Sequence, residues 1–583
     1  MINPEKLKKI KILSAITAIV LLFSLMPLSA AAETKHQIEE KALTLYVGAI
    51  DSSTEFPFYF MDGVEDLPWV ELNAWCDLLN LMYHAYLGDE NYALTYEQKG
   101  NEIILKRENG YSMTVDFAEG TIAFDDYNMF LHASSDTSLQ DILTFSGFNE
   151  AGESELFQRN TKGSFDRQGD ELLLELTKDY EIEIILQDGK GYVPFQTMGD
   201  LITSPHFLLN PFYNGKAAFL GSGSYFGDAA SGLTPVGELY YSAEPTERSK
   251  ALADYGYREL CLALDVLYGL KDVHEITSFD TLFWQIGYDE SLRDTDPWEA
   301  DAALYDFIDY YLDDLHSAFL GYSWMSGRGE LDGFYGTAST RYNTDYERYH
   351  TERAKWLGDS PYKYQEVGNT AYVLFDEFTA SIGTPYYEVL NGGQFPDDTI
   401  GLIIYAHSMI YRKDSPIQNV VIDLSCNGGG AVDAGLFVMS WVLGEAPFCV
   451  KNTTTGAFSA VLYRGDTNLD RQFDSMDEVD DKNIFCLISP LSFSCGNLVP
   501  AVFKNSQKVT LLGRTSGGGS CTVQPMSTAW GSMFQISGPS RMSFFKNGSF
   551  YDIDQGVEPD IYLSHLSSFY DRETLTKFIN GLI

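Results

Sequence analysis

The sequence is poor in cysteine and in positive charge. Its 583 residues include 7 cysteines and no Cys-x-x-Cys pair. So sparse and scattered a set predicts neither a disulfide framework nor a zinc site. Lysine and arginine total 39 against 83 aspartates and glutamates, which gives a formal net charge of −44. A protein this acidic repels phosphate backbones, so we exclude nucleic acid as a partner.

Long hydrophobic runs are also rare, and the longest lies at the start of the chain. Ile12 to Leu28 is apolar, follows a lysine-rich stretch and precedes Ala30-Ala31-Ala32. A basic, an apolar and a small-residue segment in this order predict a secretory signal peptide over residues 1–32. We therefore expect a secreted, extracellular protein, and association with the cell surface is a further hypothesis.

The length of the chain predicts more than one domain. Short alternating strands, with one helix per unit, predict an accessory region of two small α+β modules over residues 33–218. Residues 219–248 are rich in Gly, Ser, Tyr and Pro and are expected to form a linker. Helical periodicity predicts a helical segment over residues 249–363.

Strands and helices alternate in the last part of the chain. Residues 419–424, 484–489 and 508–512 are predicted strands, and residues 432–443 and 495–505 are predicted helices. Such alternation is typical of a parallel sheet with crossover helices, so residues 364–583 are predicted to form an α/β core.

Two segments of this core carry a nucleophile and backbone donors of the kind that amide hydrolysis requires. Ser494 lies at the strand-to-helix turn 492–497, where the amide of Cys495 would face a developing oxyanion. Gly429 lies in a glycine run after a buried strand and would offer a second oxyanion amide. Taken alone, the first segment also fits an ordinary helix cap, and the second fits a plain turn.

Two further segments supply a candidate base and carboxylate. His316 and Ser317 follow a predicted helix, and Asp552 and Asp554 lie in an acidic turn over residues 552–560. A histidine at a helix end often only complements the helix dipole, and an acidic turn is often only a solvated loop.

The order of these four segments resembles the carboxyl-terminal-processing and tricorn-like serine peptidases, the tail-specific protease family. The matching stretches are Leu312–His316, Asp423–Gly430 with Ser425 in place of Arg, Ser492–Asn497 and Gly556–Asp560. The resemblance implies an α/β fold with a crotonase/ClpP-like mixed-sheet core. It also implies a serine peptidase that acts on protein or peptide substrates, and neither a cofactor nor a metal is expected.

One departure from the family decides which base we predict. Processing peptidases pair the serine with a lysine, but Gly519 stands at that position here. The tricorn-like branch uses a histidine oriented by a carboxylate, which implies His316 as base, with Ser317 beside it, and Asp554 as the carboxylate. Asp552 is the second choice for the carboxylate, and His407 remains an alternative base.

The same departures support a rival hypothesis. Ser425, Asn497 and Gly519 replace family residues, so the chain would also fit an inactive peptidase-like surface protein that binds peptides or cell-wall material. The sequence does not indicate an oligomeric state.

Three smaller features of the sequence concern additional domains and metal binding. The 44 residues between Phe319 and Tyr364 are too few for a PDZ domain. The Val193-Pro194-Phe195 element loosely resembles the N-terminal modules of copper amine oxidases. Residues 466–477 have calcium-loop spacing, but Arg471 stands where glycine is needed, which favours a solvated acidic loop.

Overall fold

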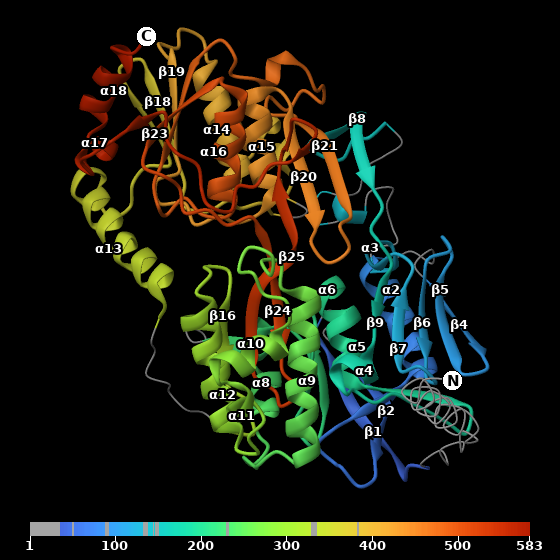
Figure 1. Ribbon diagram of the computed structural model, residues 1–583. Helices are drawn as coiled ribbons and strands as arrows, with labels where there is room; N and C mark the ends of the chain where they lie inside the picture. The colour runs from blue at the N-terminus through green and yellow to red at the C-terminus, as the bar shows by residue number, and fades with distance from the viewer. Residues whose placement is uncertain are drawn as a thin grey trace, which may run out of the picture.

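The computed structural model shows a mixed α/β protein (Figure 1). Some of its sheets contain strands from distant parts of the chain. The structure describes residues 35–48, 52–87, 93–131, 138–140, 142–143, 145, 151–228, 232–327, 335–381 and 384–583. The predicted signal peptide lies outside these residues. Within the described part of the chain, no helix is both long and apolar enough to cross a membrane.

The predicted α/β core contains a six-stranded sheet, and the predicted mixed α/β fold class is confirmed. The strand order is β17 (Tyr364–Val367), β18 (Thr370–Leu374), β19 (Asn419–Asp423), β22 (Asn483–Ile488), β23 (Val509–Gly513) and β28 (Ile561–Tyr562). Pairing is parallel from β18 to β28, and only the edge strand β17 is antiparallel. Continuous apolar runs form these strands because both faces of the sheet are covered.

Helices cover the two faces of this sheet. One face packs against α14 (Thr399–Ile410), α15 (Val432–Leu443) and α16 (Cys495–Ser506). The other packs against α13 (Thr337–Leu357), α17 (Ser567–Tyr570) and α18 (Arg572–Asn580) (Figure 1). The carboxyl ends of the parallel strands therefore lie at one edge of the sheet, and residues 424 and 489 follow directly after β19 and β22 there.

A second sheet collects strands from both halves of the chain. Its order is β16 (Ala318–Gly321), β25 (Met533–Ser543), β20 (Ala446–Asn452), β21 (Phe458–Gly465) and β8 (Phe157–Arg167), and β24 (Cys521–Ser527) also pairs with β25. Strand β8 comes from the predicted accessory region, and β16 directly follows His316. This sheet therefore ties the N-terminal region and the histidine segment to the core.

The N-terminal region contains a seven-stranded sheet and a five-stranded sheet. The first has the order β10 (Ile185–Gln187), β11 (Lys190–Pro194), β3 (Trp69–Glu71), β2 (Ser52–Met61), β1 (Ile38–Val47), β13 (Ala218–Gly221) and β12 (Asn210–Tyr213). The second has the order β4 (Leu94–Lys99), β5 (Glu102–Arg107), β6 (Ser112–Asp116), β7 (Thr121–Phe124) and β9 (Leu172–Leu174). The seven-stranded sheet takes its strands from both ends of the N-terminal region. The strands of the five-stranded sheet come from the part of the sequence between them.

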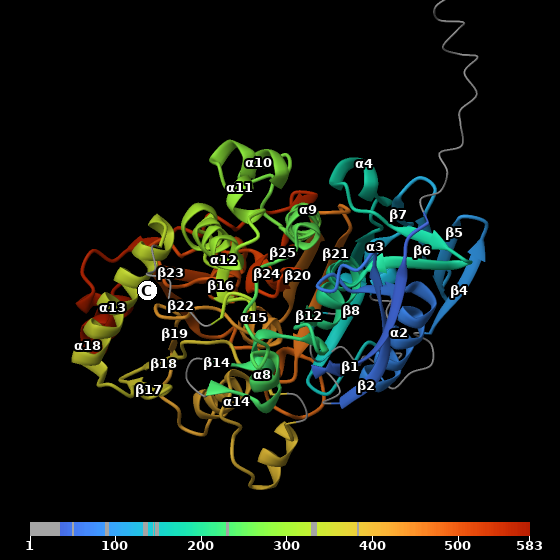
Figure 2. The same ribbon diagram turned by 90° about the horizontal axis from the view of Figure 1, so that it is seen from below.

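Short helices surround these sheets. They are α2 (Leu72–Leu87), α3 (Tyr127–Leu131), α4 (Leu176–Tyr180), α5 (Phe195–Met198), α6 (Ser204–Phe207), α7 (Gly223–Phe226) and α8 (Pro235–Tyr240). The helical segment adds α9 (Lys250–Leu267), α10 (Phe279–Ile286), α11 (Asp289–Leu292) and α12 (Pro297–Tyr305), which continues as a π-helical stretch, Asp306–Leu312. The five-stranded sheet and the C-terminal helices lie at opposite ends of the molecule (Figure 2).

The segment predicted as a linker, residues 219–248, is folded where it is described. It contains α7, α8 and the short hairpin β14 (Gly227–Asp228) and β15 (Gly232–Leu233). Phe226 and Tyr240 are buried in the same hydrophobic cluster as the N-terminal sheet, α9 and residues of β24 and β25. Its aromatic residues therefore form core rather than an extended connection.

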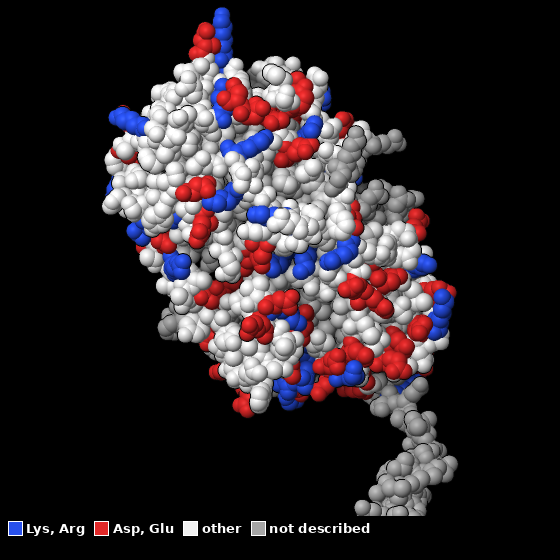
Figure 3. Space-filling view, turned by 45° about the horizontal axis from the view of Figure 1, so that its top comes forward, with Lys and Arg blue, Asp and Glu red and all other residues white. Residues whose placement is uncertain are grey.

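The negative charge is spread over the surface. Figure 3 shows acidic side chains in several groups on one face, with lysines and arginines scattered between them. This distribution offers no broad basic surface on the face that is visible.

Candidate active site

Ser494 lies in a strained turn between β22 and α16. Its φ of 56° and ψ of −122° place a non-glycine residue in a sparsely populated backbone region, and its side chain is half-buried. The Ser494 amide donates to the carbonyl of Gly518 at 2.9 Å, and the buried Ser492 hydroxyl donates to the Leu424 carbonyl at 2.6 Å. The Ser494 hydroxyl makes no cap hydrogen bond to α16, so the ordinary helix-cap interpretation does not describe this turn.

The glycine-rich turn after β19 lies directly against Ser494. A Cβ placed on Gly429 would lie 2.6 Å from the Ser494 Cβ and 3.1 Å from its Oγ, and Gly429 has a φ of +112°. Only glycine fits this close approach at that backbone conformation. The Gly429 amide already donates to Asn427 Oδ1 at 3.0 Å. No acceptor in the described residues pairs with the Cys495 amide, which faces out of the first turn of α16.

The thiol of Cys495 is not a competing nucleophile. It is fully buried and donates to the Gly430 carbonyl at 3.1 Å. Burial, with a smaller effect of Asp433, raises the pKa of Cys495 to about 12. The thiol therefore stays protonated at neutral pH.

A carboxylate organises the turn that carries His316. Asp314 accepts hydrogen bonds from the amides of His316 and Ser317 at 3.1 and 3.0 Å, and from the Ser317 hydroxyl at 2.6 Å. It also accepts from Tyr268 and Ser537 at 3.0 and 2.7 Å. The hydroxyl of Ser317 is thus occupied by Asp314, which makes Ser317 a residue that holds the turn.

The imidazole of His316 is buried against an aromatic ring. Its centroid lies 4.6 Å from that of Phe493, and 7% of the residue is exposed. Burial lowers the pKa of His316 below its usual value, while the charges of Asp314 and Asp554 oppose that effect. The ring is therefore neutral at neutral pH, as a general base requires, although no hydrogen bond joins it to the Ser494 hydroxyl.

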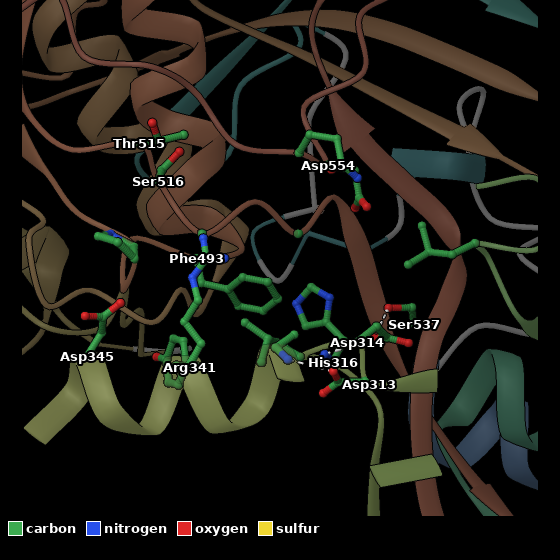
Figure 4. Close-up of a pocket in the computed structure, with 18 of the residues that line it drawn as sticks. Asp313, Asp314, His316, Arg341, Asp345, Phe493, Thr515, Ser516, Ser537 and Asp554 are labelled. Atoms are coloured by element: carbon green, nitrogen blue, oxygen red, sulfur yellow. Dashed lines mark hydrogen bonds between the residues drawn. The ribbon is translucent and has the colours of Figure 1, made fainter. Parts of the chain in front are cut away.

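The two candidate carboxylates have different surroundings. Asp552 pairs with Arg541 at 2.7 Å. Asp554 Oδ1 accepts from the amide and hydroxyl of Ser520 at 3.0 and 2.9 Å, and its charge acts on the His316 ring. Asp554 and His316 face one cavity (Figure 4), whereas Asp552 does not line it. This placement favours Asp554 over Asp552.

The cavity has a volume of about 580 Å³. Residues from the histidine turn, α13, the serine turn and the 514–519 loop line it, among them Asp313, His316, Arg341, Tyr342, Phe493, Arg514, Ser516, Gly519 and Asp554. Ser494 is not one of its lining residues. The structure therefore places Ser494 against Gly429 and places His316 and Asp554 on the same cavity. Phe493, the neighbour of Ser494 in the chain, packs its ring on His316.

The Phe493 ring leaves no room for a side chain at residue 519, the position of the lysine in the processing peptidases. Gly519 has a φ of +82°, and a Cβ there would lie 2.5 Å from the Phe493 ring. The ring that packs on His316 therefore occupies the space that a side chain at residue 519 would enter. The sequence did not identify Phe493. The glycine in place of the expected lysine was the only local sign that another side chain fills this space.

The alternative base, His407, lies in α14 outside this cavity. Its Nδ1 accepts from Trp441 Nε1 at 3.2 Å, and burial lowers its pKa to about 4. It therefore packs as a neutral core histidine.

The calcium-like loop is solvated only in part, since residues 470–472 and 474–476 are exposed. Asp466 and Asp477 are buried, and their carboxylates accept the amides of residues within the loop. Arg471 adopts a φ of 63°, the left-handed conformation for which glycine was expected. In the described part of the chain, no group of three or more His, Cys, Asp or Glu residues is arranged to hold a metal ion.

A comparison with family models finds a match in the part of the chain that carries Ser494. Residues 406–563 match the model of peptidase family S41. Over these residues the chain is similar to the peptidases of family S41. The predicted family resemblance is confirmed for this segment, which holds Gly429, Ser494 and Asp554; His316 lies outside it.

The chain spans less than half the length of the first relatives it matches, one curated protein and one solved structure. A Chlamydia pneumoniae protein, CPj1016/CpB1054, is 29% identical over 112 residues, which cover 17% of this chain and 16% of that protein. Among solved structures, the photosystem II D1 C-terminal processing protease is 16% identical, with a TM-score of 0.25, over 33% of this chain and 42% of its own. A lipoprotein from Streptococcus agalactiae is 13% identical, with a TM-score of 0.34, over 58% and 98%. The tricorn protease is 16% identical, with a TM-score of 0.23, over 46% and 22%.

Proposed function

We propose that the protein is a secreted serine endopeptidase in which Ser494 is the nucleophile and His316 is the general base. The observation that carries this proposal is the strained Ser494 turn, which holds a half-buried hydroxyl at the start of α16 against Gly429. A strained strand-to-helix turn exposes the catalytic serine in α/β-hydrolases. Secretion rests on the predicted signal peptide alone.

The proposed mechanism follows from the roles of the groups. Ser494 Oγ attacks the substrate carbonyl carbon while a His316 ring nitrogen takes the hydroxyl proton. His316 then gives this proton to the leaving amine as the peptide bond breaks. In the second half, His316 takes a proton from water, the water oxygen attacks the acyl carbon, and His316 returns the proton to Ser494 Oγ as the ester bond breaks. Asp554 would orient the imidazole and stabilise its charged form.

Two donors would stabilise the oxyanion. The Cys495 amide is available at the positive end of α16. The Gly429 amide would have to exchange its present acceptor, Asn427 Oδ1, for the oxyanion. Catalytic hydrogen bonds in unliganded enzymes are often long and shorten when the substrate binds, so the absent His316–Ser494 bond alone does not rule out this pair.

That absent bond and the occupied Gly429 amide favour one second candidate, an inactive peptide-binding protein on a peptidase scaffold. The two candidates differ in whether a peptide is cleaved. We would incubate the protein, without residues 1–32, with internally quenched peptides and with a denatured protein substrate.

The proposal expects cleavage that falls by at least about a thousandfold in Ser494→Ala. Ser408→Ala, which changes the exposed serine of the other His-Ser pair, is the control and should keep full activity. Absence of cleavage by the folded wild type, together with peptide binding, would support the second candidate instead.

A further inference from the structure

Arg341 is a cation at the cavity that has no partner among the described residues. It lies on α13, lines the cavity and is exposed. Figure 4 shows its side chain rising from α13 toward Phe493, with His316 beyond the Phe493 ring. No ion pair or hydrogen bond of its guanidinium is formed with the part of the chain that the structure describes. An unpaired arginine is unexpected in a protein with a net charge of −44.

The acidic side chains that line the same cavity are already engaged. Asp313 accepts the amides of Ala338 and Ser339 at the start of α13, at 2.6 and 3.0 Å. Asp345 pairs with Arg348 at 3.7 Å. The remaining two, Asp314 and Asp554, accept the hydrogen bonds described above. None of the four forms an ion pair or a hydrogen bond with Arg341.

The second arginine of the cavity is held by the protein. Arg514 Nη2 donates to the Ser564 carbonyl at 2.8 Å, and its Nε to that of Leu563 at 3.4 Å. Its guanidinium also lies 5.8 Å from the centre of the Tyr562 ring. Arg341 is thus the cavity cation that is free to bind an anionic group of a ligand.

We propose that Arg341 binds a carboxylate of the peptide substrate and so selects peptides with an acidic group close to the cleaved bond. The planar guanidinium can hold a carboxylate with two parallel hydrogen bonds. The carboxylate could belong to an acidic side chain or to the substrate's own C-terminus. This inference rests on the proposed function, since it assigns the specificity of that same site.

The test compares peptides that differ only in charge. One cleaved peptide is made with Glu or with Gln at each position flanking the cleaved bond in turn, and each version has a free or an amidated C-terminus. The ratio of kcat/KM between acidic and neutral versions is measured for the wild type, Arg341→Gln and Arg341→Lys. Lys355→Gln removes a positive charge from the same helix away from the cavity and is the control.

At one position or at the C-terminus, the wild type should prefer the acidic version by about fivefold, the size expected for a partly exposed ion pair. Arg341→Gln should abolish the preference, Arg341→Lys should keep part of it, and Lys355→Gln should leave it unchanged. The position or terminus concerned identifies the source of the carboxylate. Equal ratios in wild type and Arg341→Gln would overturn the inference.

Binding separates this inference from the proposed function. Fluorescence anisotropy with Ser494→Ala measures the affinity for labelled peptides carrying Glu or Gln, at low and high salt. A Glu preference that needs Arg341 and weakens in salt would support the inference even if the wild type cleaves nothing. Equal affinities with and without Arg341 would contradict it, whatever the activity.

Discussion

At the scale of single residues, the ring of Phe493 determines how the two parts of the candidate site are arranged. It packs on His316 at 4.6 Å, and Gly519 leaves the space that the ring fills. The neighbouring residue, Ser494, faces Gly429. Rotation of one aromatic side chain would therefore change the approach between the proposed base and nucleophile.

The ionisation of His316 gives a pH prediction. Because a general base must be neutral and burial lowers the pKa of His316, kcat/KM should fall on the acid side with a midpoint below 6.5, the ordinary value. Asp554→Asn removes a charge that raises this pKa, so the midpoint should move to still lower pH while kcat falls about a hundredfold or more.

The matched comparison for that pH profile is Asp552→Asn, since Asp552 pairs with Arg541 outside the cavity. Its acid limb should stay where the wild type has it. If the midpoint of the acid-side fall in kcat/KM shifts in Asp552→Asn but not in Asp554→Asn, the orienting carboxylate is Asp552 rather than Asp554.

Gly519 gives a stability prediction. Gly519→Ala should lower the free energy of unfolding by about 1–3 kcal/mol, because the new Cβ would meet the Phe493 ring. Gly189→Ala is the control, since Gly189 has nearly the same φ, +81°, but nothing within 4 Å of a new Cβ. Urea denaturation should show a larger decrease in the free energy of unfolding for Gly519→Ala than for Gly189→Ala. Equal decreases would show that the Phe493 ring moves aside without destabilising the protein.

At the scale of secondary-structure elements, helix α18 supplies a cation to the core sheet. Arg572 Nη2 lies 2.6 Å from Asp423 Oδ2 at the end of β19, and both side chains are buried. The Ser425 hydroxyl donates to the other oxygen of Asp423 at 2.6 Å. The position where family motifs have arginine is thus a serine, and the charge that faces Asp423 comes from almost 150 residues later.

Breaking this ion pair should be costly. Arg572→Met leaves a buried aspartate without a counter-charge, which should reduce the free energy of unfolding by about 3–5 kcal/mol. Lys577→Met, on the exposed side of the same helix, should change it little. Adding Asp423→Asn to Arg572→Met should recover part of the loss, and a further loss of the full size would contradict this account.

Local sequence patterns predicted the core elements well. The helix over residues 432–443 coincides with α15, and the strands at 419, 484 and 508 lie within one or two residues of β19, β22 and β23. Their signals are continuous apolar runs and turn residues, which need no distant partner. The pairings of β8 with β21 and of Arg572 with Asp423 depend on contacts far apart in the sequence, so no local pattern indicates them.

The same distinction applies to the site. Glycines and serines after strands indicated Gly429 and Ser494, because such turns are read from neighbouring residues. The roles of Asp314 and Phe493 arise where separate segments meet, so the sequence did not reveal them. The linker prediction was wrong for a similar reason, since the buried Tyr240 donates its hydroxyl to the Gly531 carbonyl, which lies far along the chain.

At the scale of the whole molecule, the N-terminal region and the core share structure. Strand β8 pairs with β21, and one hydrophobic cluster contains residues of the N-terminal sheet, α9 and β25. The predicted boundary at residue 218 therefore cuts through continuous packing. The N-terminal region supports the strands that follow the histidine turn and the 514–519 loop.

A deletion of residues 33–218 should accordingly fail to give a stable protein. It would expose the edge of β21 and the apolar faces of α9 and β25, which favours aggregation. We expect little soluble protein and no cooperative thermal transition, measured by size-exclusion chromatography and circular dichroism. A soluble truncated chain that retains peptide cleavage would show that the core folds alone.

The most direct measurement of the central claim, that His316 activates Ser494, is covalent labelling with a fluorophosphonate. Mass spectrometry of the digested protein identifies the labelled residue, and Ser408→Ala serves as the control. We predict one label, on Ser494, that is absent in Ser494→Ala, much slower in His316→Gln and unchanged in the control. An unlabelled folded wild type, or a label on Ser494 that forms equally fast in His316→Gln, would contradict the account.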